Sequence, residues 1–134
     1  MISFLGLGTM GSPMAMNLLK QEGSLLVWNR SPEPQEKLVA AGATGAKDAK
    51  EALGAELSIS MFSNDAAADA VLSAENISPD TVHICMASIS PELARTLTKR
   101  FADKGAKYIS AAVLGRPKVA EAGALNILAA GDPS

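Results

Sequence analysis

The chain has 134 residues, of which 48% are hydrophobic and 19% charged. This length suits one domain, and the apolar share excludes an intrinsically disordered chain. The formal net charge of −2 at pH 7 argues against nucleic acid as a partner, because phosphate binding needs a basic surface. The single cysteine, Cys85, excludes a disulfide framework and a cysteine-based zinc site, and we expect no bound metal.

The sequence lacks the features of membrane and secreted proteins. No apolar run approaches the length of a bilayer span. The first residues, MISFLGLG, lack the basic start and the cleavage site of a secretion signal. A lone thiol suits a reducing compartment. We therefore predict a cytoplasmic protein without a membrane partner.

Short apolar runs alternate with helix-like segments along the chain. This alternation favours βαβ units, and so an α/β fold with a doubly wound, mostly parallel sheet of the Rossmann type. In chain order the expected elements are strand 2–7, helix 10–21, strand 25–28, a helix from 32 to a stop at Gly42, helix 48–53, strand 57–61, an alanine-rich helix after Asp65, strand 81–86, helix 91–104, and strands 108–112 and 125–129.

Three of these helices have recognisable start signals. Ser31 and Ser90 each precede a proline, the preferred residue of a first helical turn, and Asp65 is the expected cap of the alanine-rich helix. Asp69, four residues later, is expected to be solvated rather than a metal ligand. Only five residues follow the last expected strand, so we expect residues 1–134 to be one domain of a longer protein, truncated at its C-terminal end.

The most informative motif is G-x-G-x-x-G, formed by Gly6, Gly8 and Gly11 between the first strand and the first helix. The first glycine permits a tight turn, the second removes a Cβ that would block a pyrophosphate, and the third allows close packing of the helix on the strand. The N–H groups and the dipole of the helix start favour phosphate. The motif in this context predicts dinucleotide binding.

The end of the second strand indicates which dinucleotide is bound. NAD-binding versions of the motif place a carboxylate there, on the ribose 2′-hydroxyl. This chain has Asn29, Arg30 and Ser31 instead, which supply donors to a 2′-phosphate and no negative charge. The pattern favours NADP, with NAD as a weaker alternative.

At this point the sequence resembles a known family. Residues 6–20, GLGTMGSPMAMNLLK, resemble the N-terminal signature of the β-hydroxyacid dehydrogenases, a group that includes 3-hydroxyisobutyrate dehydrogenase and has 6-phosphogluconate dehydrogenase as a relative. The segment 61–63 resembles the one that lines the adenosine ribose, and the segment 87–91 resembles the one near the nicotinamide ribose. The resemblance extends over nearly the whole chain.

Together the residues and the resemblance give two sets of expected contacts. The expected cofactor contacts are Gly6, Leu7, Gly8, Thr9, Met10, Gly11, Asn29, Arg30, Ser31, Met61, Phe62, Ser63 and Ser88. The expected substrate contacts are Ser88, Val113, Leu114 and Gly115.

The resemblance implies an NADP-dependent oxidoreductase that transfers a hydride between the nicotinamide and a small hydroxy acid, or a related carbonyl or imine. It also implies a helical C-terminal domain that carries the catalytic lysine and its supporting asparagine and forms a homodimer. Those parts are not among these 134 residues. We therefore expect no catalytic residue here and no turnover by this chain alone.

The substrate segment departs from the family pattern. Where the family has Asp-Ala-Pro-Val-Ser-Gly-Gly, this chain has Ser-Ala-Ala-Val-Leu-Gly-Arg, from Ser110 to Arg116. Leu114 removes a hydroxyl that would bind substrate, which makes a less polar substrate, an aldehyde or an imine plausible. This departure also motivates an alternative, a non-catalytic module that senses a dinucleotide or acts as a scaffold.

His83 and Cys85 lie two residues apart in an expected strand. No partner for proton transfer is identifiable for His83, so we interpret it as a packing residue that faces a helix or a sheet edge. Cys85 is interpreted as a small buried apolar residue.

Overall fold

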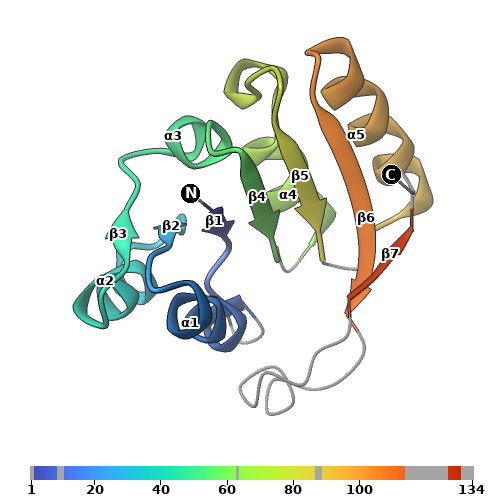
Figure 1. The fold of residues 1–134 in the computed structure, drawn as a ribbon. Coiled ribbons are helices and arrows are strands. Elements are labelled where there is room, and N and C mark those ends of the chain that lie inside the picture. The colour runs from blue at the N-terminus through green and yellow to red at the C-terminus, as the bar shows by residue number, and fades with distance from the viewer. Residues whose placement is uncertain (1, 9–10, 63, 87–88, 114–126, 131–134) are drawn as a thin grey trace.

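The computed structural model describes residues 2–8, 11–62, 64–86, 89–113 and 127–130 (Figure 1). Its strands are β1 (Ile2–Leu5), β2 (Leu26–Trp28), β3 (Thr44–Gly45), β4 (Leu57–Ser60), β5 (Val82–Cys85), β6 (Lys107–Val113) and β7 (Ile127–Ala130). Its helices are α1 (Gly11–Glu22), α2 (Pro32–Ala40), α3 (Ala49–Leu53), α4 (Asp65–Val71), the 3₁₀ turn η1 (Ala74–Asn76) and α5 (Pro91–Asp103).

The described strands form one sheet in the order β3-β2-β1-β4-β5-β6-β7. The pairings from β3 through β6 are parallel, and β7 alone runs antiparallel, beside β6. The chain proceeds outward from β1 to β3 and then returns to β4 on the other side of β1, so the order reverses between β1 and β4. The predicted doubly wound α/β fold is confirmed. Ligands bind such sheets at the carboxyl ends of the strands beside the reversal.

Helices cover both faces of the sheet. Neighbouring residues of β1 point to opposite faces, so each face receives apolar side chains from this strand. Phe4 packs in a cluster with Met14 and Leu19 of α1. Leu5 belongs to the opposite cluster, with Leu97 and Phe101 of α5. Phe4 and Leu5 are fully buried, and each such side chain stabilises the fold by roughly 1.5–3 kcal/mol. Both apolar layers therefore hold the strand that leads into the glycine turn.

The predicted elements were correct in order and slightly wrong in extent. The first expected strand, 2–7, ends at Leu5, since Gly6 turns the backbone to a φ of 91°. The two-residue strand β3 and the turn η1 were missed, because neither is long enough to produce an apolar period. The short β3 nevertheless pairs with β2 and completes that edge of the sheet.

The helix caps bring two corrections. Asp65 does not cap α4: Asn64 does, accepting from the N–H of Ala67 at 2.8 Å. The Asp65 carboxylate instead accepts from the N–H of Ser90 at 3.1 Å, which joins the starts of α4 and α5. Ser31 precedes α2 as expected but makes no capping hydrogen bond with its side chain.

Two side chains of the same region, Ser90 and Asp69, each contact a backbone or side-chain group of α5. Ser90 caps α5 as predicted, by accepting from the N–H of Leu93 at 3.2 Å. Asp69, expected to be solvated, is 54% exposed but forms an ion pair with Arg100 of α5 at 2.8 Å.

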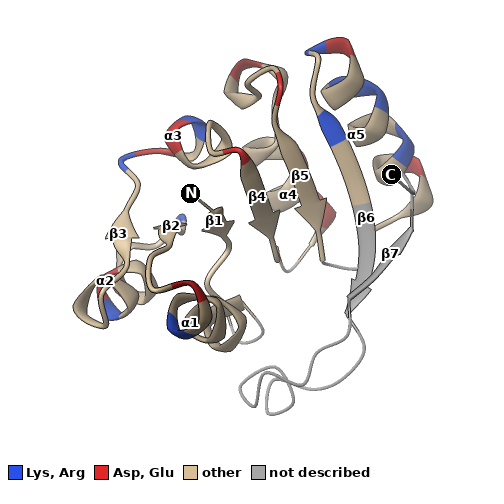
Figure 2. Cartoon of the chain, in the orientation of Figure 1, with Lys and Arg blue, Asp and Glu red and all other residues tan. Residues whose placement is uncertain are grey.

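Charged residues avoid the centre of the sheet. Strands β1, β4 and β5 carry no Lys, Arg, Asp or Glu, whereas α5 carries Arg95, Lys99 and Arg100 (Figure 2). Among the described residues, no helix combines the length and the apolar character needed to cross a bilayer.

Candidate functional site

The glycine turn is shaped by contacts that leave no room for a side chain at its first position. Gly6 has a φ of 91°, and its N–H donates to the carbonyl of Trp28 at 3.0 Å. A Cβ at this position would lie 2.5 Å from the carbonyl oxygen of Met61, at the end of β4. Backbone conformation and space therefore both require glycine here.

The second and third glycines of the motif differ in what surrounds them. A Cβ on Gly11 would overlap the carbonyl oxygen of Gly6, so the start of α1 rests directly on the turn. A Cβ on Gly8 would meet no atom of the described protein within 4 Å. Packing therefore explains Gly11, whereas the space at Gly8 is open, as an approach for a pyrophosphate requires.

A cavity of about 420 Å³ connects the turn with the ends of β2 and β4. The predicted cofactor residues that line it are Gly6, Gly8, Gly11, Asn29, Arg30, Ser31, Met61 and Phe62. Asn64, Ala67 and Val71, from the start and body of α4, close the other wall and were missed by the sequence analysis. The signal that could have found them is the position of α4, which directly follows a strand beside the sheet reversal.

Leu7 lies differently from the other predicted cofactor residues. Its side chain is 2% exposed and packs in the core below the turn. Its N–H donates to Oδ1 of Asn29 at 2.8 Å, and its carbonyl accepts from the hydroxyl of Ser12 at 2.7 Å. Leu7 therefore fixes the turn to β2 and α1.

Asn29 joins the glycine turn to the segment 29–31, which we name the β2 loop. Besides accepting from Leu7, its side-chain N–H₂ donates to the carbonyl of Ser31 at 2.9 Å. One of its two amide protons is therefore used within the loop. Asn29 is predicted to donate to phosphate, and in the structure its side chain also holds the β2 loop in shape.

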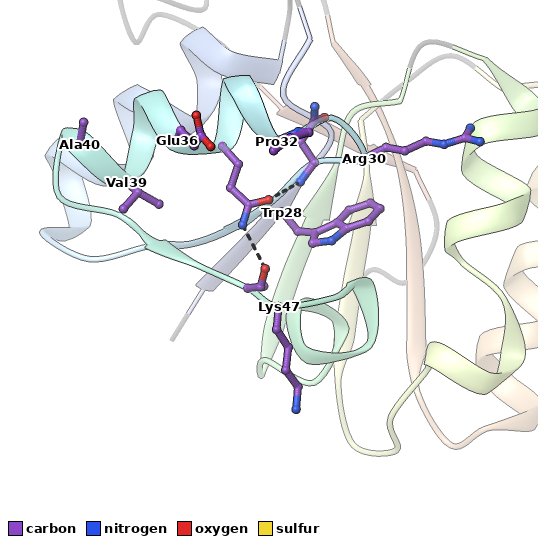
Figure 3. A pocket seen from close by; sticks show the side chains of 10 residues that line it. Trp28, Arg30, Pro32, Glu36, Val39, Ala40 and Lys47 are labelled. Carbon is purple, nitrogen blue, oxygen red and sulfur yellow. Dashed lines mark hydrogen bonds between the residues drawn. The ribbon is translucent and has the colours of Figure 1, made fainter.

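Arg30 is the cation at this site. Its side chain is exposed, and among the described residues its guanidinium forms neither a hydrogen bond nor an ion pair. In Figure 3 the side chain extends away from α2. An arginine that has no carboxylate partner presents its full fork of N–H donors to an incoming anion.

A second, shallower cavity of about 600 Å³ lies on the other side of the β2 loop. Asn29 and Arg30 line both cavities. Trp28 lies between Arg30 and Lys47 in Figure 3, with Val39 and Ala40 of α2 along the far side. This cavity is larger, but it does not include the glycine turn, so the smaller one is the better candidate for a dinucleotide.

His83 lies within the sheet, away from both cavities. It is fully buried, with Nδ1 2.6 Å from the hydroxyl of Ser58 and Nε2 2.8 Å from that of Ser60. Its ring stacks on Phe101 at a centroid distance of 5.3 Å. Burial lowers the pKa of His83 from 6.5 to about 3, so the ring is neutral at physiological pH. The interpretation as a packing residue agrees with this position, although the two serine partners were not foreseen.

Several predicted residues lie outside the described part of the chain. They are Thr9, Met10, Ser63, Ser88, Leu114 and Gly115. Val113 is described only as the last residue of β6. Cys85 is buried, as expected. The predicted substrate contacts therefore stay predictions.

Comparison with known proteins extends these observations. The family described as the NAD binding domain of 6-phosphogluconate dehydrogenase matches residues 1–134. Mitochondrial 3-hydroxyisobutyrate dehydrogenase of Drosophila melanogaster is 37% identical over 97% of this chain and 41% of its own length. The chain spans less than half the length of the first curated relatives it matches.

Solved structures also match this chain over only part of their length. The 3-hydroxyisobutyrate dehydrogenase of Mycobacterium tuberculosis superimposes with a TM-score of 0.90 at 28% identity, over 98% of this chain and 46% of that one. A reductive aminase from Aspergillus terreus, solved with NADPH and ethyl-5-oxohexanoate, gives a TM-score of 0.79 at 27% identity, over 88% of this chain and 42% of that one. The shared region is in each case less than half of the compared protein.

Proposed function

Because the chain belongs to the family of NAD binding domains of 6-phosphogluconate dehydrogenase, whose relatives here include dehydrogenases and reductases, we propose that residues 1–134 are the NADP-binding domain of an NADP-dependent oxidoreductase. One observation carries the choice of NADP. The cavity beside the glycine turn is lined by Arg30, whose guanidinium is unpaired among the described residues, and no acidic residue lines it.

Different residues of this cavity bind different parts of the cofactor. The N-terminus of α1 and the open space at Gly8 receive the pyrophosphate. The Arg30 guanidinium and the Ser31 hydroxyl bind the 2′-phosphate, while Met61 and Phe62 contact the adenosine. The absence of an acidic residue from the first turn of α1 removes a like charge from the phosphate end of the site. Bound NADP(H) would supply hydride transfer, and this domain would hold and orient it.

The substrate proposal is broader. The matched proteins include one named for dehydrogenation of a hydroxy acid and one named for reductive amination, so we propose a small hydroxy acid or a related carbonyl or imine. Because the chain spans less than half of these relatives, we also propose that catalysis, and association as a homodimer, need sequence beyond these residues. On this reading the 134-residue chain alone binds cofactor without turnover.

Calorimetric titration of the chain with NADPH and with NADH tests the proposal. We expect tighter binding of NADPH. Replacing Arg30 with alanine should weaken NADPH binding by roughly 10- to 150-fold, the loss of a charge-assisted hydrogen bond worth about 1.5–3 kcal/mol, and should leave NADH binding nearly unchanged. Arg95→Ala, at an exposed site on α5, is the matched control.

Two outcomes would count against the proposal. Equal affinity for NADPH and NADH would remove the role given to Arg30. Absence of binding by a chain whose circular dichroism shows it to be folded would favour a scaffolding module instead.

A further inference from the structure

The ladder between β2 and β3 ends in an unusual way. The N–H of Ala46 donates to the carbonyl of Val27 at 2.8 Å, as in an ordinary parallel pair. In a continued parallel ladder the next hydrogen bond would run from the N–H of Asn29 to the carbonyl of Ala46. That bond is replaced by a side chain. The Asn29 N–H donates to Oε1 of Gln35 at 3.1 Å, and Nε2 of Gln35 donates to the Ala46 carbonyl at 3.0 Å.

The Gln35 amide is thus inserted between two strands, and its two hydrogen bonds are the dashed lines in Figure 3. Oε1 accepts and Nε2 donates, as an amide side chain requires, so both of its ends are used. The inserted amide lets β2 and β3 separate where the second cavity opens, while the backbone groups of both strands remain paired.

This bridge acts directly on the backbone of the β2 loop, and it reaches the glycine turn only through the side chain of Asn29. Gln35 holds the backbone of Asn29, the residue directly before Arg30. The turn receives one hydrogen bond from Asn29, whose Oδ1 accepts from the Leu7 N–H, but it also has anchors that do not involve Asn29. These run from the N–H of Gly6 to the Trp28 carbonyl and from the hydroxyl of Ser12 to the Leu7 carbonyl. Loss of the bridge would therefore loosen the segment that carries Arg30 and leave the pyrophosphate end in place.

We propose that Gln35 is a positioning residue that sets the preference for NADPH over NADH, by holding the β2 loop so that Arg30 faces the 2′-phosphate. The inference rests on the proposed function. Gln35 itself lines only the second cavity, so it acts through Asn29 and Arg30 rather than by contact with the cofactor.

A substitution at Gly45 offers a second way to disrupt the hydrogen bonds of Gln35. A Cβ at this position would lie 2.8 Å from Nε2 of Gln35. The closest contact is with the end of a flexible side chain, and the next, with Cγ2 of Val39 at 3.3 Å, needs a shift of only a few tenths of an ångström. Gly45→Ala should therefore displace the amide with little loss of stability. Its φ is not in the region that favours glycine, which removes backbone strain as a competing explanation.

The experiment measures the dissociation constants of NADPH and NADH for the 134-residue chain and four variants. Gln35→Met keeps the length of the side chain and removes both hydrogen bonds, and Gly45→Ala displaces the amide. The double variant tests whether the two act through one contact, and Gln21→Met, on the exposed side of α1, is the matched control. Urea unfolding of each variant reports stability separately.

We expect Gln35→Met and Gly45→Ala each to weaken NADPH binding by roughly three- to tenfold, the fold-change that accompanies loss of one ordinary hydrogen bond, with NADH binding altered by less than about twofold. The double variant should be no weaker than the weaker single variant, because both changes break the same bridge. The control should match the unmodified chain for both cofactors.

The outcomes separate this inference from the proposed function. If the unmodified chain binds neither cofactor, or binds both equally, the proposed function and this inference both fail. If it prefers NADPH and Arg30→Ala abolishes the preference while Gln35→Met retains it, the inference alone fails. Equal weakening of both cofactors by Gln35→Met would show a merely structural role and overturn it too. Additive effects of the two changes would overturn the role given to Gly45.

Discussion

The neutral, buried His83 predicts a specific loss of stability in acid. When the chain unfolds, the imidazole regains its ordinary pKa of 6.5, whereas in the folded chain burial lowers the pKa to about 3. Between these values the unfolded state binds a proton that the folded state does not. The contribution of His83 to stability is therefore fully present above pH 6.5 and is lost as the pH falls toward 3.

The size of the effect follows from this difference. Each pH unit within the window lowers the free energy of unfolding by about 1.4 kcal/mol, so we expect a loss of roughly 2.5 kcal/mol between pH 7 and pH 4.5. The surroundings explain why the folded chain resists protonation. The neutral ring needs one donor and one acceptor, which Ser58 and Ser60 provide, and the stacked Phe101 offers no negative charge to a cation.

Two measurements check this prediction. The chain has one histidine, so the ring signals in an NMR pH titration are unambiguous, and they should not shift between pH 8 and pH 5 in the folded state. Urea unfolding at pH 7 and pH 4.5 then gives the stability change, and His83→Gln, which cannot titrate, subtracts the contribution of carboxylates. A titration midpoint near 6.5 in the folded chain, or equal acid sensitivity of the two proteins, would refute the reasoning.

Two further predictions concern the glycine turn and the contact between α4 and α5. Gly8→Ala should change the free energy of unfolding by less than about 0.5 kcal/mol, because its Cβ meets no atom of the described residues, but it should reduce NADPH affinity in calorimetry. Gly6→Ala should destabilise the fold by more than about 1 kcal/mol in urea unfolding, because of its positive φ and its close approach to the Met61 carbonyl. Unchanged NADPH binding by Gly8→Ala would contradict the placement of the pyrophosphate. Asp69→Asn should cost less than about 1 kcal/mol, and the cost should shrink in 1 M salt, since the ion pair with Arg100 is partly exposed. A larger cost that is independent of salt would show that the pair is more than a surface contact.

The sequence was informative where one residue type has one physical use. Gly6 and Gly11 were placed correctly because turn conformation and helix packing both demand glycine. Ser90 was correctly predicted as a cap, whereas Ser31, which also precedes a proline, makes no capping hydrogen bond with its side chain. The alternation of apolar runs was sufficient to predict a doubly wound sheet. The order of the strands, with the reversal beside β1, agrees with that prediction.

Other features could not be read from the sequence because they depend on partners far apart in the chain. Asn64 and Asp65 are both suitable capping residues. Asn64 caps α4, whereas the Asp65 carboxylate accepts a hydrogen bond from the N–H of Ser90, 25 residues later. The sequence around Gln35 gives no sign of its role, because its partner, the Ala46 carbonyl, is brought close only by the position of β3 in the fold. His83 obtains its serines from a neighbouring strand, 23 and 25 residues earlier.

The central position of β1 has a consequence for how the chain is made. This strand precedes both of its partners in the chain: it pairs on one side with β2 and on the other with β4, whose residues Leu57–Ser60 come more than 50 positions later. The apolar strand Ile2–Leu5 is therefore synthesised well before β4, and it stays unpaired on that side until residues 57–60 have been made. Parallel pairings between distant segments form slowly, and an exposed strand is open to wrong partners while it waits. A bulky insertion directly before Ile2 would therefore act on the middle of the sheet during this interval rather than on an edge.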